Sequence, residues 1–160
     1  MKKLTNAKFC FILDDGVKRM IIMGIDYGDA RVGIAVSDRT ELIATAVCTL
    51  NVKGMRDAAE KAAAKAKELG AEKIVLGLPK NMDGSESFRA EKTRAFAEML
   101  APLCGLETEF FDERLSTVEA YTYMNIAGYN GKKRRKAVDS LSAQIILQSK
   151  LDALRAESGR

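Results

Sequence analysis

The order of strand-type and helix-type segments limits this chain to a small set of folds. Three short segments rich in β-branched residues, 21–26, 32–37 and 42–50, follow one another with only turn residues between them. From residue 55 onward helical and strand patterns alternate, with helices predicted over 55–69, about 85–103, 115–127 and 135–154, and strands over 73–78 and 107–111. A three-stranded antiparallel start followed by βα units predicts an α/β fold, a mixed five-stranded sheet with helices on both faces.

Helical periodicity also predicts which side chains of the later helices face the core. Gly70 is expected to end the first helix, and Asp83 or Ser85 to cap the start of the second. The predicted buried faces are Phe88, Phe96, Met99, Leu100 and Leu103 in the second helix, and Val138, Leu141, Ile145 and Leu151 in the last.

The length of 160 residues suits one compact domain. We expect a non-catalytic leader over 1–22, a catalytic domain over 23–155 and a short tail over 156–160. No apolar run reaches the roughly 18 residues needed to cross a bilayer, and the leader lacks the apolar core of a secretory signal. A cytoplasmic protein without a membrane partner is therefore expected.

The absence of histidine excludes several kinds of chemistry. Nucleophiles activated by histidine and zinc sites with histidine ligands are not available to this chain. The cysteines, Cys10, Cys48 and Cys104, are too far apart in sequence for a CxxC motif and are expected to be small apolar side chains in a reducing compartment. Hydrolytic chemistry here must rest on carboxylates, lysines, hydroxyls or a bound metal.

Three acidic residues stand where a sheet of this kind places its ligands. Asp26 ends the first strand, Glu113 follows the last strand, and Asp139 lies near the start of the final helix. Ligands of open α/β sheets bind outside the carboxyl ends of the strands, so these carboxylates are expected to converge there. Each has a plainer interpretation: a turn former for Asp26, a surface acid for Glu113, and a residue that answers the helix dipole for Asp139.

Crowded carboxylates predict a metal, because close like charges repel by several kcal/mol in a poorly screened site. Mg²⁺ or Mn²⁺ is the expected cofactor, since hard cations prefer oxygen ligands. A pair of such ions could activate water and stabilise the leaving oxygen at phosphorus, which would leave a 5′-phosphate and a 3′-hydroxyl. The acids thus predict a hydrolase that acts on phosphate esters.

Basic and polar residues near the acids are predicted to bind a polyanion. The net charge is +4 and the pI about 9.0, and five cations follow one another at 132–136. Such a run is also compatible with a solvated loop, and the arginines with plain salt bridges. The predicted substrate-binding residues are Arg31, Lys80, Asn81, Ser85, Arg114, Lys132, Lys133, Arg134 and Arg135.

At four segments the sequence resembles the YqgF/RuvX family. They are MGIDYGDARVGIAVSD at 23–38, IVLGLPKNMDGSES at 74–87, FFDERLSTVEA at 110–120 and AVDSLSAQIILQSKLD at 137–152. The resemblance implies a ribonuclease-H-like fold, Asp26, Glu113 and Asp139 as the active-site acids, and Mg²⁺ or Mn²⁺ as cofactor. It departs from the family pattern at Ser116, where Thr is more usual, and at Ser142, where Ala is more usual.

The same resemblance implies a nuclease that matures the 5′ end of pre-16S ribosomal RNA, with the ribosomal precursor particle as a partner. Resolution of four-way DNA (Holliday) junctions is the alternative, and it would need a dimer that presents two sites, whereas the chain is expected to be a monomer or a weak homodimer. A non-catalytic nucleic-acid-binding assembly factor is a further alternative. An actin-like ATP-binding protein is disfavoured, because such proteins hold nucleotide between two domains and this chain supplies one.

Overall fold

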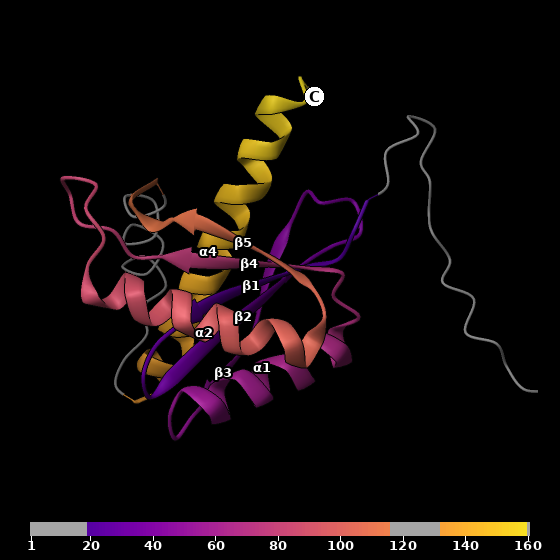
Figure 1. The fold of residues 1–160 in the computed structure, drawn as a ribbon. Coiled ribbons are helices and arrows are strands. Elements are labelled where there is room, and N and C mark those ends of the chain that lie inside the picture. The colour runs from indigo at the N-terminus through magenta and orange to yellow at the C-terminus, as the bar shows by residue number, and fades with distance from the viewer. Residues whose placement is uncertain (1–18, 116–131, 160) are drawn as a thin grey trace, which may run out of the picture.

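A computed structural model describes residues 19–115 and 132–159, and the side chains of α4 from residue 138 onward (Figure 1). Its five strands form one sheet in the order β3-β2-β1-β4-β5. The strands are β1 (Ile22–Tyr27), β2 (Arg31–Ser37), β3 (Ala44–Asn51), β4 (Lys73–Leu78) and β5 (Glu107–Asp112). The first three strands are antiparallel neighbours, whereas β4 and β5 run parallel to β1. The predicted mixed five-stranded sheet is confirmed.

Helices cover both faces of the sheet, as predicted. Helices α1 (Met55–Leu69) and α2 (Phe88–Cys104) lie side by side on one face, and α4 (Lys132–Glu157) crosses the other (Figure 1). Gly70 ends α1 in the left-handed conformation, at φ 66°. One cluster of apolar residues, including Met23 and Ile25 of β1, fills the α1/α2 side, and a second, including Ile22 of β1, fills the α4 side. The central strand is therefore buried on both faces.

The predicted buried face of α2 is partly wrong. Phe96 and Leu100 are fully buried, but Phe88, Met99 and Leu103 are exposed. The other buried residues of α2 are small, namely Ala90, Thr93 and Ala97. Small residues allow α2 to pack closely, which turns the remaining large side chains toward solvent.

The last helix also differs from the prediction. It begins at Lys132 and not near 135, so the basic run forms its first turn, and it continues to Glu157. Leu151 is buried as predicted, whereas Val138, Leu141 and Ile145 are only partly buried. The residues packed against the sheet are Ala143, Ile146, Leu147 and Leu151. The first described range, 19–115, ends with a 3-10 turn, η1 (Glu113–Leu115). The helix predicted over 115–127 therefore lies almost wholly outside the described residues.

No helix among the described residues is both long enough and apolar enough to cross a membrane.

Candidate active site

Asp26 lies near the carboxyl end of β1, on the face that α4 covers. Side chains alternate along a strand, and Ile22 and Gly24 of β1 contact α4 while Met23 and Ile25 belong to the opposite core. Asp26 therefore projects toward α4. Its direct partner on β2 is Gly33, and cross-strand partners share one face.

Asp139 reaches the same place because Gly33 has no side chain. A Cβ atom at Gly33 would stand 1.9 Å from the backbone oxygen of Asp139 and 3.1 Å from the nitrogen of Ser140. Gly24 allows a similar approach, since its Cβ would stand 2.8 Å from Cβ of Leu147. The turn of α4 that carries Asp139 thus rests on β2 directly opposite Asp26.

Glu113 approaches from the other side of β1. It is the first residue of η1, immediately after β5, and its Oε1 lies 2.7 Å from where a Cβ of Gly77 would be. Gly77 belongs to β4, the strand between β1 and β5. Acids from three separate elements therefore gather on the α4 face of the sheet, at the carboxyl ends of the parallel strands.

The acids affect one another electrostatically. Burial, and then the negative charges of Glu113 and Asp139, raise the pKa of Asp26 to about 7, against the opposing effects of Arg89 and a hydrogen bond from Ser142. Burial also raises the pKa of Glu113, which Arg89 opposes, and the pKa of Asp139, which Arg31 opposes. At neutral pH Asp26 is thus poised between its neutral and charged forms, and a nearby cation would favour the charged one.

The donor set suits a hard divalent cation. Asp139 Oδ2 is buried and accepts no hydrogen bond from the described residues, although Nε of Arg31 lies 2.9 Å away in an ion pair. The contact with Arg31 is therefore an ion pair without a hydrogen bond to this oxygen. Within the described residues no three acidic, Cys or His side chains are yet arranged as ligands of one ion. The carboxylates are of the chemistry that a hard divalent cation prefers, and they lie near one another without forming the ligand shell of a single ion.

Arg89 is a site residue that sequence analysis missed. Together with Asp26, Arg31, Asp139 and the turn that joins β1 to β2, it lines one hollow, which we call the acid hollow. Its charge opposes the raised pKa values of both Asp26 and Glu113. The signal in the sequence was a cation in the first turn of a helix, where the dipole disfavours positive charge unless acids lie near.

The predicted substrate-binding residues divide into groups. Arg31 lines the acid hollow as an ion-pair partner of Asp139. Arg114 makes hydrogen bonds of 3.0, 3.1 and 2.6 Å to the Asp112 carboxylate, and Lys80 Nζ lies 3.9 Å from the same group. The structure does not bring Lys80 or Arg114 into the acid hollow. Both instead pair with Asp112 at the end of β5.

The remaining predicted contacts lie elsewhere. The Asn81 side-chain amide donates to Oγ of Ser85 over 2.9 Å, within a turn between β4 and α2. The residues Lys132, Lys133, Arg134 and Arg135 form the first turn of α4, and their side chains lie outside the described part of the structure. Their roles in substrate binding stay predictions.

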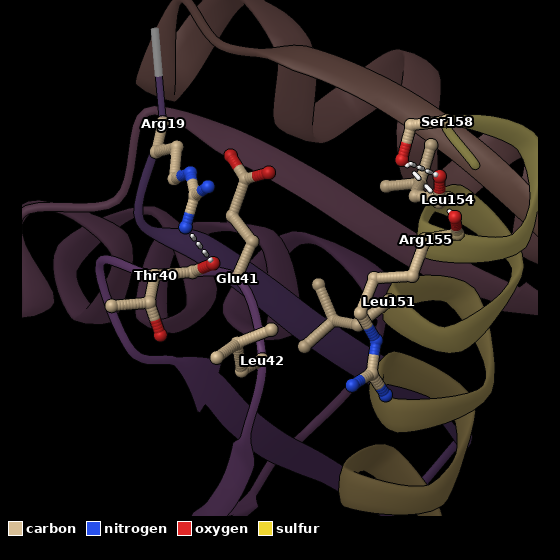
Figure 2. A pocket seen from close by; sticks show the side chains of 8 residues that line it. All are labelled: Arg19, Thr40, Glu41, Leu42, Leu151, Leu154, Arg155 and Ser158. Atoms are coloured by element: carbon tan, nitrogen blue, oxygen red, sulfur yellow. Dashed lines mark hydrogen bonds between the residues drawn. The ribbon is translucent and has the colours of Figure 1, made fainter. Parts of the chain in front are cut away.

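A second hollow lies at the opposite end of β1 (Figure 2). Arg19, Thr40 and Glu41 line one side of it, and the last turns of α4 line the other. Its polar groups anchor the chain: Arg19 donates to the Thr40 carbonyl over 3.2 Å, and Glu41 accepts the Met20 N–H over 2.7 Å. This hollow holds the start of β1 in place and is remote from the acids.

The sequence matches the profile of a known protein family over most of its length. The sequence profile described as RuvX, Holliday junction resolvase, matches residues 20–153. The chain belongs to the RuvX family. This confirms the resemblance inferred from the four motifs, and it covers all five strands, α1, α2 and most of α4.

Three curated relatives of this RuvX protein carry the same provisional name. A pre-16S rRNA nuclease, provisionally so named, from Clostridioides difficile strain 630 is 44% identical over 131 residues, which cover 82% of this chain and 93% of the relative. A protein of the same name from Pelotomaculum thermopropionicum is 42% identical, with 84% and 88% covered, and one from Myxococcus xanthus is 43% identical, with 85% and 90% covered. The RuvX family is thus a nuclease family by both its description and its relatives' names.

Among solved structures, Thermus thermophilus RuvC in complex with a Holliday junction substrate matches with a TM-score of 0.51. The match covers 88% of this RuvX chain and 96% of RuvC at 11% identity. At that identity it speaks for the fold alone, and it confirms the ribonuclease-H-like architecture.

Proposed function

We propose that this RuvX protein is a metal-dependent nuclease, a hydrolase that cleaves phosphodiester bonds with Asp26, Glu113 and Asp139 as its acids. The observation that carries the proposal is geometric: glycines at 33 and 77 allow α4 and η1 to place two carboxylates close enough to Asp26 to raise its pKa. The unsatisfied Oδ2 of Asp139 supports a cation there. The mutual electrostatic effect of the acids supports it as well.

Oxygens of these three residues would hold Mg²⁺ or Mn²⁺, which when bound supplies Lewis-acid activation of water and neutralises charge at phosphorus. The chain's own groups do the rest. Arg89 brings positive charge to the acid hollow and can bind a phosphate oxygen. Ser142 donates to Asp26 and orients it, while Arg31 holds Asp139.

Precursor 16S ribosomal RNA, cleaved at its 5′ end, is the substrate we propose, with the ribosomal precursor particle as partner and the cytoplasm as location. Relatives at 42–44% identity that carry this substrate in their provisional name support it. Resolution of four-way DNA junctions is the second candidate, because the family description names it. A nucleic-acid-binding assembly factor without catalytic activity is the third candidate.

Cleavage assays separate these candidates. We expect precursor RNA to be cut in Mg²⁺ or Mn²⁺ but not in EDTA, with 5′-phosphate and 3′-hydroxyl ends identified by mass spectrometry. A 2′,3′-cyclic phosphate would contradict the proposal, because the 2′-hydroxyl would then be the nucleophile. If the protein cleaves a four-way DNA junction and leaves the precursor RNA uncut, the second candidate is favoured. Binding without cleavage of either substrate would indicate an assembly factor.

Metal binding is also expected to stabilise the folded protein. At a free Mg²⁺ or Mn²⁺ concentration about 100 times its Kd, the gain is about 2.7 kcal/mol, or roughly 5–10 °C in Tm. The gain should shrink from pH 8 to pH 5.5, because the pKa of Asp26 is about 7 and protons then compete with the metal. Differential scanning fluorimetry measures both effects.

Asp112→Asn is the matched control for this metal effect. Asp112 precedes Glu113, but its carboxylate is bound by Arg114 and its pKa is lowered chiefly by that hydrogen bond. D112N should keep the metal-dependent rise in Tm, whereas Asp139→Asn should lose it. Equal rises in the parent, D112N and D139N would place the metal elsewhere.

A further inference from the structure

An aromatic side chain stands exposed beside the acid hollow. Phe88, the first residue of α2, is 70% exposed. The next residue, Arg89, lines the acid hollow. A large exposed aromatic ring next to a catalytic centre is informative, since such rings usually bury their area in a core or an interface.

Lys92 connects the Phe88 ring to the site. Its Nζ lies 5.1 Å from the ring centroid and 2.8 Å from Oδ2 of Asp29. Asp29 belongs to the β1–β2 turn and lines the acid hollow. The ammonium group therefore covers one face of the ring and ties it to the rim of the hollow. The ring's high exposure leaves most of its remaining surface accessible.

The ring makes no contribution to the core that would explain its presence. Phe96, two turns further along α2, is fully buried and stacks on Tyr27 with ring centroids 4.4 Å apart. Phe88 lies off that buried face. The charged residues of α2 nearest to it are Arg89, Glu91 and Lys92. Two of these three are cations, of which Lys92 lies over the ring and Arg89 lines the acid hollow, and this favours a polyanionic partner over an apolar protein surface.

We infer that Phe88 is a stacking platform for an unpaired base of the strand whose backbone enters the acid hollow. The inference rests on the proposed nuclease function and adds a substrate class to it, nucleic acid that is single-stranded next to the cleaved bond. Bases within a duplex have no free face, whereas unpaired bases stack on exposed aromatic rings regardless of sequence. Arg89 and Lys92 would meet the flanking phosphates.

The test uses the absence of tryptophan from the chain. Phe88→Trp introduces a single reporter at the proposed platform, and Leu103→Trp introduces one at the far end of α2, where Leu103 is 50% exposed. The full-length variants are titrated in EDTA, so that no cleavage occurs, with a ten-nucleotide single-stranded RNA and with a blunt RNA duplex. We expect the single strand to quench the fluorescence of F88W but not of L103W, and the duplex to quench neither.

Affinity gives a second measurement. Phe88→Ala should weaken single-strand binding, measured by fluorescence anisotropy, by roughly 5- to 100-fold, while Phe88→Tyr should stay near the parent. Unchanged single-strand affinity in F88A, or equal quenching of F88W and L103W, would overturn the inference. F88A that changes only self-association in sedimentation would assign the ring to a protein contact.

The two proposals fail separately in these experiments. A parent that cleaves RNA with metal while F88W gives no quenching would overturn the stacking platform and leave the nuclease intact. If the single strand quenches F88W but the parent cleaves no substrate, the nuclease function is rejected and the stacking platform stands. No binding of the single strand by any form would reject both.

Discussion

Replacing Asp26 with asparagine is expected to reduce phosphodiester cleavage by at least about a thousandfold. Asp26 is the central acid, because the charges of both Glu113 and Asp139 raise its pKa. Asparagine keeps the shape of the side chain but removes the negative charge that would attract a cation. Single-turnover cleavage at saturating Mg²⁺ measures the effect. Asp112→Asn, one residue from Glu113 but bound to Arg114, should stay within a few-fold of the parent, and a D26N variant that did so too would remove Asp26 from the mechanism.

The same substitution should make the metal-free protein more stable. The pKa of Asp26 is about 7 in the folded state, against 3.8 as its ordinary value. Because the folded pKa is the higher one, the contribution of this group to stability is fully present below about pH 4 and is lost as the pH rises toward 7. D26N removes that loss, which amounts to about 3 kcal/mol at pH 8 once partial exposure to water is allowed for.

Urea unfolding in EDTA at pH 4.5 and pH 8 measures this difference. D26N and the parent should differ little at the lower pH, and D26N should be the more stable at the higher pH. A parent that is the more stable form at pH 8 would show that Asp26 is not destabilised by its surroundings. Opposite effects on catalysis and stability are expected of a carboxylate kept for function.

The fold was largely predictable because its signals are local. Strand periods, the helical alanine pattern of α1 and the glycine at 70 each act within a few residues, and they fixed the element order. The faces of the later helices were less predictable, because packing chooses among several apolar residues. In α2, small residues such as Ala90 and Ala97 occupy the interface, and Phe88 is left outside.

The acids could be predicted but their arrangement could not. Strand ends and a helix start marked Asp26, Glu113 and Asp139, because a sheet of this topology gathers ligands at one edge. The approach of Arg89 depends on how α2 lies across the sheet. The loop residues Lys80 and Asn81 were expected to meet substrate, yet the structure gives them partners within the protein. Long-range packing decides such contacts, and no local pattern encodes them.

Glycines in the strands were the overlooked sequence signal. Glycine within a strand weakens it and often marks a close approach of another backbone. The motif segments place Gly24, Gly33 and Gly77 in β1, β2 and β4, and each faces α4 or Glu113. These three positions fix how closely the acids meet.

Gly33→Ala is accordingly expected to damage both the fold and the activity. The new Cβ would stand 1.9 Å from the backbone oxygen of Asp139, and a backbone atom cannot move aside without shifting α4. We expect a loss of at least about 3 kcal/mol in the free energy of unfolding, from overpacking, and a large loss of cleavage. Gly70→Ala is the control, because Gly70 has φ 66° and open space around it. It should cost about 1 kcal/mol from backbone strain and leave cleavage unchanged.

Gly77→Ala separates the placement of an acid from the stability of the fold. The three atoms nearest to its Cβ would be side-chain atoms and not backbone: Cδ1 of Ile146 at 2.6 Å, and Oε1 and Cγ of Glu113 at 2.7 and 3.3 Å. These side chains can change rotamer, so the free energy of unfolding should fall by only about 1 kcal/mol. The Glu113 carboxylate would nevertheless be displaced from Asp26, and cleavage should fall by at least tenfold while G77A stays folded. If G77A cleaves at the parental rate, the position of Glu113 is not critical for cleavage. If G33A then loses both stability and activity, the activity depends on the packing of α4 on β2.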